Sequence, residues 1–257
     1  MPLPPGRTLS LSRGRRMVND ILYLTRDVPL VKVEREINIS EVAAAREAAI
    51  PKPGWYPILL KSFALACMNL PELRRSLLKF PYARLYQHAC TVAAVTVERE
   101  VDGEPAVLIF HVREPERKPL AQIHDRFQRV KTEPVENVPD FRRPLRLLRL
   151  PRPMRHAVLN LGMYWSGSWR EKFGGTFAAS STVAAGATIT LPCTPLSSIF
   201  TFDELKPDGR VTLHLAWDHR VFDGMTAARG LVETERMLRG PILAELLSLA
   251  RPARLAV

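Results

Sequence analysis

Two apolar, strand-like segments joined through one Asp-Gly pair constrain the fold of this chain more than any other feature. Cys90 to Val97 (CTVAAVTV) and Ala106 to Val112 (AVLIFHV) lie on either side of Asp102-Gly103. Asp-Gly between two such segments is a strong local signal for a β-hairpin, because both residues tolerate positive φ angles. We therefore expect two adjacent antiparallel strands, which any fold proposed for the chain has to contain.

Further strand and helix patterns alternate along the chain. The expected strands cover residues 30–37, 176–180, 188–191, 199–202 and 211–217. The expected helices begin after an N-cap at Ser40, at Pro57, at Glu72 (ending at Leu78), after Pro119 and at Met225. These assignments rest on apolar periodicity and on capping and turn residues, including a turn at 207–209. Hairpins combined with helical crossovers predict one α/β domain with a mixed sheet.

The chain is strongly basic. Its 257 residues include 37 Lys plus Arg and 26 Asp plus Glu, for a formal net charge of +11, and 46% of the residues are hydrophobic. The hydrophobic content excludes a disordered basic tail. Basic proteins bind nucleic acid, anionic membranes or phosphorylated small molecules. We expect no nucleic-acid partner, because no recognised nucleic-acid motif accompanies the charge.

Several other classes of protein are not indicated. No run of about 18 apolar residues is present, and the start of the chain lacks the apolar region of a signal peptide. Cys67, Cys90 and Cys193 are scattered and show no ligand spacing, so we expect a reducing, cytoplasmic setting and no metal site. Phosphate-binding glycine loops are also absent from the sequence.

Residues 132–172 differ in composition from the rest of the chain. Five prolines interrupt the segment, at positions 134, 139, 144, 151 and 153. Six arginines follow one another with no acidic residue between them, namely Arg142, Arg143, Arg146, Arg149, Arg152 and Arg155. The prolines argue against one long amphipathic helix. Either the segment is a solvated arm over a neighbouring subunit, or its arginines contact anionic lipid or coenzyme A phosphates.

The segment Leu213 to Gly224 (LHLAWDHRVFDG) carries the clearest chemical pattern. A predicted strand runs directly into His219, whose unperturbed pKa near neutrality suits a general base. Asp223 can fix local geometry through an ion pair, and Gly224 permits a tight turn into the next helix. Taken alone, a histidine near an aspartate is more often a hydrogen-bonded structural pair.

The surrounding residues give the pattern a context. Asp218-His219-Arg220-x-x-Asp223-Gly224 resembles the signature of the dihydrolipoyl acyltransferases of 2-oxoacid dehydrogenase complexes and of their relative chloramphenicol acetyltransferase. Gly174 to Ser181 (GGTFAASS) is similar to their Gly-Gly-Thr-Phe-x-x-Ser strand, and Arg16-Met17 to their opening Arg-Met. The resemblance runs from about Arg15 to Leu247 with a gap at 132–172. It implies a chloramphenicol acetyltransferase-like α/β fold, with a mixed β-sheet flanked by helices in a single domain.

The resemblance also implies a mechanism. His219 would deprotonate a thiol, or a hydroxyl or amine, for attack on an acyl thioester, and Ser180 would donate a hydrogen bond to the resulting oxyanion. Asp223 would be structural, with Arg16 as its partner and Arg13 or Arg15 as alternatives. The family resemblance further implies a homotrimer whose active sites lie between subunits, possible assembly into larger particles, and coenzyme A or acyl-CoA as substrate.

Departures from the family pattern leave the acyl group and the acceptor open. Ser181 to Ala185 replaces the usual Asn and Gly residues after Ser180. About fifteen residues precede Arg16, too few for a lipoyl or subunit-binding domain. We therefore expect a stand-alone acyltransferase without a covalently bound lipoyl group. Its expected parts are an extension at 1–15, a catalytic domain at 16–250 and a tail at 251–257.

Two alternatives remain. One is a catalytically inactive trimeric scaffold or membrane-surface binding module that uses Arg142 to Arg155, peripheral at the membrane. The other is a Ser-His-Asp hydrolase, which is disfavoured because the sequence has no G-x-S-x-G nucleophile elbow.

Overall fold

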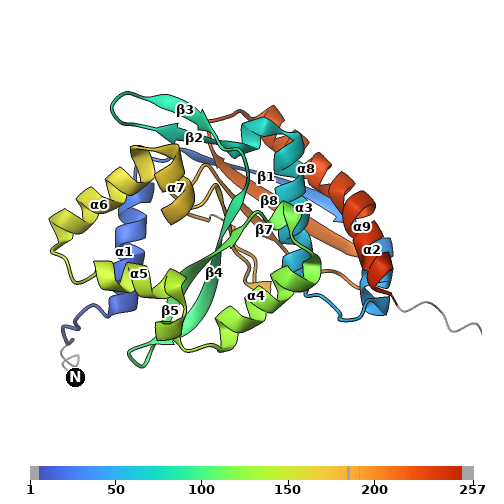
Figure 1. Cartoon of the computed structure of the whole chain (residues 1–257), viewed down its shortest axis with the longest axis horizontal. Coiled ribbons are helices and arrows are strands. Elements are labelled where there is room, and N and C mark those ends of the chain that lie inside the picture. Colours follow the sequence, from blue (N-terminus) through green and yellow to red (C-terminus); the bar gives the residue numbers. More distant parts are fainter. Residues whose placement is uncertain (1–5, 184–185, 191, 251–257) are drawn as a thin grey trace, which may run out of the picture.

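A six-stranded mixed sheet forms the centre of the computed structural model, which describes residues 6–183, 186–190 and 192–250 (Figure 1). In spatial order the strands are β1 (Leu30–Asn38), β8 (Arg210–Asp218), β7 (Ser198–Phe202), β6 (Phe177–Ala179), β4 (Val92–Val101) and β5 (Glu104–Arg113). β6 runs parallel to β4 and β7, and the other neighbours are antiparallel. The predicted α/β class with a mixed sheet flanked by helices is confirmed.

The β4–β5 hairpin forms as the sequence predicts. Val101 pairs with Glu104 around the two turn residues, Asp102 and Gly103, whose φ angles are +58° and +79°. Alternate residues of β5 are buried and exposed, as expected for a strand with one face on the core. Both turn residues are types that adopt positive φ readily, so the hairpin has a local cause.

Helices cover the two faces of the sheet. One face carries the main apolar core beneath α3 (Trp55–Asn69), α4 (Leu120–Thr132) and α8 (Gly224–Met237). There Phe63 of α3 stacks on Phe200 of β7 with ring centroids 4.7 Å apart. The other face carries a smaller cluster beneath α1 (Arg13–Thr25) and α6 (Arg152–Tyr164). The second face is therefore less extensively covered by apolar side chains of this chain.

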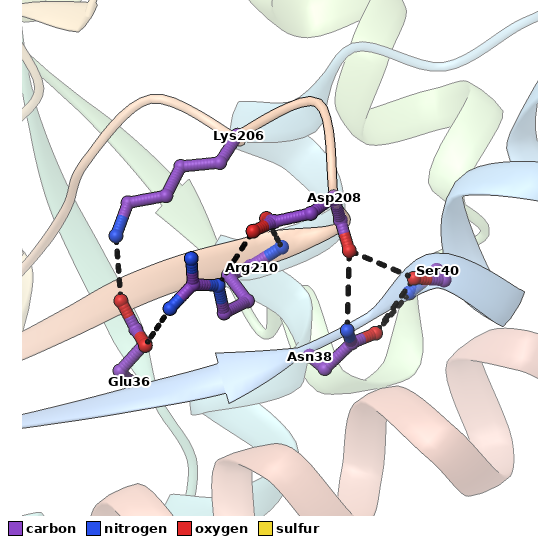
Figure 2. Close-up of polar contacts among 6 residues, drawn as sticks. All are labelled: Glu36, Asn38, Ser40, Lys206, Asp208 and Arg210. Carbon is purple, nitrogen blue, oxygen red and sulfur yellow. Dashed lines mark hydrogen bonds and ion pairs between the residues drawn. The ribbon is translucent and has the colours of Figure 1, made fainter.

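The turn between β7 and β8 is tied to β1 by charged side chains (Figure 2). Glu36 of β1 accepts hydrogen bonds from Lys206 at 2.6 Å and from Arg210 at 3.0 Å. All three side chains are solvent-exposed, so each pair contributes little to stability by itself. Together, the two ion pairs hold the turn beside β1.

Ser40 anchors the same turn, but not as the predicted N-cap. It is the first residue of α2 (Ser40–Ala48), the N-cap position belongs to Ile39, and the Ser40 hydroxyl donates to Asn38 at 2.7 Å (Figure 2). The Asn38 amide in turn donates to the carbonyl of Asp208 at 3.2 Å. The polar side chain is therefore used to hold the turn against β1 rather than to cap the helix.

Two other predicted elements are wrong. The helix expected at 72–78 is instead η1 (Pro71–Arg74) followed by β2 (Arg75–Leu78), which pairs with β3 (Arg84–Gln87). The buried guanidinium of Arg74 donates hydrogen bonds to the carbonyls of Cys67 and His88. These hydrogen bonds favour the 3-10 turn and the strand over a continuous helix. Residues 188–190 form no strand, and Leu191 of that prediction lies outside the described residues. The Thr188 hydroxyl instead donates to the Asp203 side chain at 2.8 Å.

The proline- and arginine-rich segment folds into three short helices, α5 (Pro139–Leu147), α6 and α7 (Gly167–Phe173). The segment packs on its own chain, since Arg155 is only 7% exposed and pairs with Asp20 of α1. The prediction of a solvated arm is therefore wrong in this respect. Arg155 therefore does not belong with the five exposed arginines of the segment.

The remaining elements complete the fold. They are η2 (Pro115–Arg117), η3 (Val135–Asn137), η5 (Leu238–Ile242) and α9 (Leu243–Leu249). In the part of the chain that the structure describes, no helix has both the length and the apolar character needed to cross a membrane.

Candidate active site

His219 lies directly after β8, at one end of the sheet. Its side chain is exposed, its backbone N–H donates to the carbonyl of Pro29 at 3.2 Å, and its ring lies 5.9 Å from the Trp217 indole. The backbone is therefore fixed while the imidazole remains open to solvent. An accessible imidazole on a fixed backbone is suited to proton transfer with a bound substrate.

Two contacts hold the turn that carries His219. Asp218 is 5% exposed and accepts two side-chain hydrogen bonds from Arg220, each 2.8 Å long. These hydrogen bonds raise the pKa of Arg220, so the pair stays charged. The Trp217 indole donates to the carbonyl of Phe222 at 2.8 Å. The residues on both sides of His219 are thus fixed independently of it.

Arg170 of α7 supports the same region and was not identified from the sequence. It is 2% exposed and donates to the carbonyls of Met163 and Pro195, each at 3.1 Å. Burial lowers the pKa of Arg170 to about 10, opposed by the nearby charges of Tyr164 and Asp218. The arginine-rich segment is therefore connected structurally to the loop before β7 and to the surroundings of Asp218.

Asp223 acts as the N-cap of α8. Its carboxylate accepts hydrogen bonds from the Thr226 hydroxyl at 3.1 Å and the Thr226 backbone N–H at 3.3 Å. These hydrogen bonds, the hydroxyl first, hold the pKa of Asp223 below its usual value. The capping role is structural, and it fixes where α8 begins immediately after the His219 turn.

The predicted ion pair between Arg16 and Asp223 is absent from the described part of this single chain. The α1 helix packs along β5, with Gly14 against Ala106, whereas Asp223 follows β8. β8 and β5 are four places apart in the sheet, roughly 19 Å. The charge of Arg16 acts on Asp102 instead, and its Nε is buried without a partner. The alternative Arg13 also pairs with Asp102.

Ser180 lies immediately after β6. Its backbone N–H donates to the carbonyl of Phe200 at 3.2 Å, and its Oγ accepts a hydrogen bond from the Thr96 hydroxyl at 2.8 Å. A serine hydroxyl can accept one hydrogen bond and donate another, so Ser180 can bind Thr96 and still donate to a further acceptor. The side chain is half-buried, so a ligand can reach it.

The structure places Ser180 level with the middle of β8 and His219 beyond the end of that strand. Ser180 follows Ala179, which pairs with Phe200 in parallel, and the next β7 residue, Thr201, pairs with His214 on β8. His219 lies five residues beyond His214, roughly 16 Å along the strand. Two strand spacings add roughly 10 Å sideways. One copy of the chain therefore cannot apply both side chains to one bond, which also excludes an intrachain Ser180-His219-Asp223 triad.

A row of polar side chains surrounds Ser180 on its face of the sheet, and sequence analysis did not identify it. Thr96, Thr201 and His214 occupy the row next to Ala94, Ala178 and Ala216 of the smaller apolar cluster. Their only sequence signal is that each interrupts an apolar strand. Thr201 Oγ1 and His214 Nδ1 are buried and have no hydrogen-bond partner among the described residues.

The second ring nitrogen of His214, Nε2, does have a partner. Its Nε2 lies 2.8 Å from Asp203 Oδ1, whereas Glu34 Oε2 lies 3.4 Å from Nδ1 without hydrogen-bond geometry. Burial favours a raised pKa for Asp203, but hydrogen bonds from His214 and Thr188 outweigh burial and lower it. The sheet near Ser180 thus carries hydrogen-bonding groups with unused capacity. In the described ranges, no group of three or more His, Cys, Asp or Glu side chains is placed to hold a metal.

A basic cleft of about 250 Å³ lies between β5, α4 and α5. Its charged lining consists of Arg113, Lys118, Arg126 and Arg129 together with His111 and one carboxylate, Asp140. Asp140 is already paired with both Arg126 and His111. The cleft therefore retains positive charge and is chemically suited to an anionic group such as a phosphate.

Solved structures of acyltransferase cores share this fold. The dihydrolipoamide acetyltransferase of Azotobacter vinelandii is 21% identical, with a TM-score of 0.66, over 96% of this chain and 100% of that one. The truncated 2-oxoacid dehydrogenase complex core of Thermoplasma acidophilum is 16% identical, with a TM-score of 0.66, over 92% and 99%. A probable dihydrolipoamide acetyltransferase of Listeria monocytogenes is 15% identical, with a TM-score of 0.64, over 91% and 94%.

These identities establish the fold rather than the reaction. No protein-family model matches the sequence, and no curated protein does. The chain has the architecture of dihydrolipoamide acetyltransferase catalytic cores, so the resemblance seen at 174–181 and 218–224 is confirmed at the level of fold.

Proposed function

We propose that the protein is an acyltransferase that moves an acyl group between a thioester and a thiol, at a site shared by two copies of the chain. The observation that carries the proposal is that Ser180 and His219 have complementary chemistry but lie roughly 16 Å apart along the strands and two strand spacings apart across them. The Azotobacter structure concerns the catalytic role of a serine, a histidine and an asparagine, the last two being four residues apart. His219 and Asp223 have the same spacing.

The reaction follows from the side chains. The His219 imidazole removes the proton of the acceptor thiol, and the thiolate attacks the thioester carbonyl to form a new C–S bond. Negative charge develops on the carbonyl oxygen, where the Ser180 hydroxyl donates a hydrogen bond. When the intermediate collapses, the original C–S bond breaks and the departing thiolate takes the proton from the imidazolium. Asp223 does not titrate in this scheme and holds the start of α8.

The arrangement of the two residues also favours a closed ring. A contact that joins the Ser180 region of one copy to the His219 region of the next is head-to-tail, and such contacts form a cyclic oligomer when their rotation closes. We propose a homotrimer, the assembly that the family resemblance implies. Each of its sites takes His219 from one copy and Ser180 from another.

Coenzyme A is the thiol or thioester carrier that we propose, with dihydrolipoamide as the other reactant to test. The basic cleft supports this choice, because it offers unpaired positive charge to the phosphates of coenzyme A. A thermal-shift series with acyl-CoAs of increasing chain length tests binding directly, since a ligand that binds the native state raises the melting temperature with concentration. No shift with any member would contradict the assignment of coenzyme A.

The experiment that tests the function is acyl transfer from acyl-CoA to dihydrolipoamide, followed by release of the free coenzyme A thiol. We expect His219→Ala to abolish transfer and to leave the melting temperature and the oligomeric state unchanged, because the imidazole is exposed. His124→Ala, a histidine of α4 far from β8 in sequence, is the matched control and should remain active. Full activity in His219→Ala would overturn the proposal.

A further inference from the structure

The α6 helix presents an apolar face to solvent. Met154, Val158, Leu161 and Trp165 are spaced to lie on one side of the helix and are 54%, 47%, 43% and 47% exposed. Trp169 and Phe173 extend the exposed apolar surface onto α7. We call these six residues the outer stripe. Figure 1 shows α6 at the rim of the molecule, beside α1.

The side of α6 that faces the protein packs Met163 and Tyr164 into the smaller apolar cluster and also carries polar side chains that bind α1. Arg155 donates to both carboxylate oxygens of Asp20, at 2.8 and 3.1 Å. His156 lies 3.2 Å from the same carboxylate and stacks on Tyr23 with centroids 3.7 Å apart, and Asn160 donates to the Tyr23 hydroxyl. An ordinary surface helix turns its apolar residues to the core and a polar side to solvent, whereas α6 has apolar residues on its outer side as well. Exposed apolar patches of this kind mark interaction sites.

The sequence beside the outer stripe is mainly basic, and Glu171, between Trp169 and Phe173, is paired with His88. Residues 141–170 contain no Asp or Glu. Five arginines of this segment are exposed, namely Arg142, Arg143, Arg146, Arg149 and Arg152. Arg155 and Arg170 are excluded because both are buried. The positive charge of these arginines favours an anionic partner for this surface.

We propose that the outer stripe and its five exposed arginines bind an anionic lipid membrane, with α6 lying in the plane of the interface. Helices that combine an apolar face with basic residues bind membranes in this orientation. Tryptophans such as Trp165 and Trp169 are favoured at the level of the lipid headgroups, and arginines attract anionic headgroups. The Asp20 cluster holds α6 in the exposed position from which it reaches the membrane.

The test is flotation of the full-length protein with vesicles of phosphatidylcholine alone or with about 30% phosphatidylserine, a composition that carries the anionic charge. We expect binding to the anionic vesicles only, weakened by salt. Arg142→Gln/Arg146→Gln/Arg149→Gln should weaken it roughly a hundredfold, at about fivefold for each arginine. Leu161→Gln/Trp165→Gln should weaken it about tenfold or more through the lost apolar contact.

Matched controls alter equally exposed residues elsewhere. Arg26→Gln/Arg117→Gln/Arg236→Gln removes the same charge, and Val232→Gln/Leu247→Gln removes a similar apolar surface. Both should bind like the unmodified protein. Absence of binding to anionic vesicles, or equal loss in controls and stripe variants, would overturn the proposal. A change in oligomeric state of Leu161→Gln/Trp165→Gln, measured by light scattering, would instead assign the outer stripe to contacts between copies and overturn it as well.

Discussion

Ser180 is hydrogen-bonded to Thr96, and its hydroxyl has the capacity to donate to an oxyanion when it accepts from Thr96. We predict that Ser180→Ala lowers kcat about 10²- to 10³-fold, equivalent to about 2.7–4 kcal/mol, because the oxyanion loses one preorganised donor. KM should change little, since the contact is made in the transition state. Steady-state kinetics of acyl transfer measures both quantities.

Ser181 supplies the control for this prediction, because it is the adjacent residue with the same side chain. Ser181→Ala should keep kcat close to that of the unmodified protein. If the two variants lose activity equally, Ser180 has no special role in stabilising the oxyanion.

Asp140 makes stability depend on pH. Burial alone raises the pKa of Asp140, but the hydrogen bond with His111 and the charge of Arg126 outweigh burial, and the net pKa is lowered. A carboxylate whose pKa is lower in the folded state stabilises the fold above its unfolded pKa of about 3.9. That stabilisation is lost as the pH falls through the folded pKa.

We therefore predict that Asp140→Asn lowers the free energy of unfolding by about 1–3 kcal/mol at pH 7, through loss of charged hydrogen bonds. The difference from the unmodified protein should shrink at pH 3. Urea unfolding at the two pH values measures it, with Asp125→Asn, an exposed aspartate of α4, as the control. An equal difference at both pH values would contradict the role assigned to the ionised carboxylate.

The residues of the site differ in how readily they can be identified from the sequence. The motifs containing Ser180 and His219 are visible because neighbouring residues repeat a family pattern. Thr96, Thr201 and His214 come together only through strand register, which couples positions more than a hundred residues apart. The sequence offers no local signal for such a row.

At the scale of elements, the turn between β7 and β8 depends on the glycine at position 209. Gly209 has a φ of +81°, and an added Cβ would lie 2.0 Å from Ser40 Oγ. We predict that Gly209→Ala destabilises the fold by about 1–3 kcal/mol, from backbone strain together with the displaced Ser40 side chain. Urea unfolding measures the change.

The Gly103→Ala variant distinguishes the cost of backbone strain from the cost of displacing Ser40. Its φ is +79°, but an added Cβ would have no heavy atom within 4 Å. Gly103→Ala should therefore show the strain alone and lose less stability than Gly209→Ala. Equal losses would mean that the contact with Ser40 contributes nothing.

Elements with local causes were predicted from the sequence, and those set by distant contacts were not. The β4–β5 hairpin follows from Asp102-Gly103, and α4 follows from its apolar spacing. The expected helix at 72–78 fails because Arg74 takes carbonyl partners at Cys67 and His88 and leaves the next residues to pair with β3. Helix propensity is a weak preference that tertiary contacts override.

At the scale of the whole molecule, strand order determines what one chain can do. The ion pair expected between Arg16 and Asp223 is not formed, because α1 packs on β5 while Asp223 follows β8. The same order separates Ser180 from His219. Local sequence patterns do not determine strand order. The separation of Arg16 from Asp223 and of Ser180 from His219 is therefore seen only in the folded chain. The boundaries of the catalytic domain stay a prediction.

The central claim is that each active site takes His219 from one copy and Ser180 from another. Co-expression of His219→Ala chains and Ser180→Ala chains with different tags, followed by purification through both tags, yields mixed oligomers. In a mixed trimer that carries both tags, about one site in three combines an intact histidine with an intact serine. Each variant alone serves as the inactive control.

The measurement is the acyl-transfer activity of the mixed oligomers per site. The shared-site account predicts recovery to about a third of the unmodified activity, far above either variant alone. Activity no higher than that of the separate variants would contradict it, because a site contained within one chain cannot be restored by mixing.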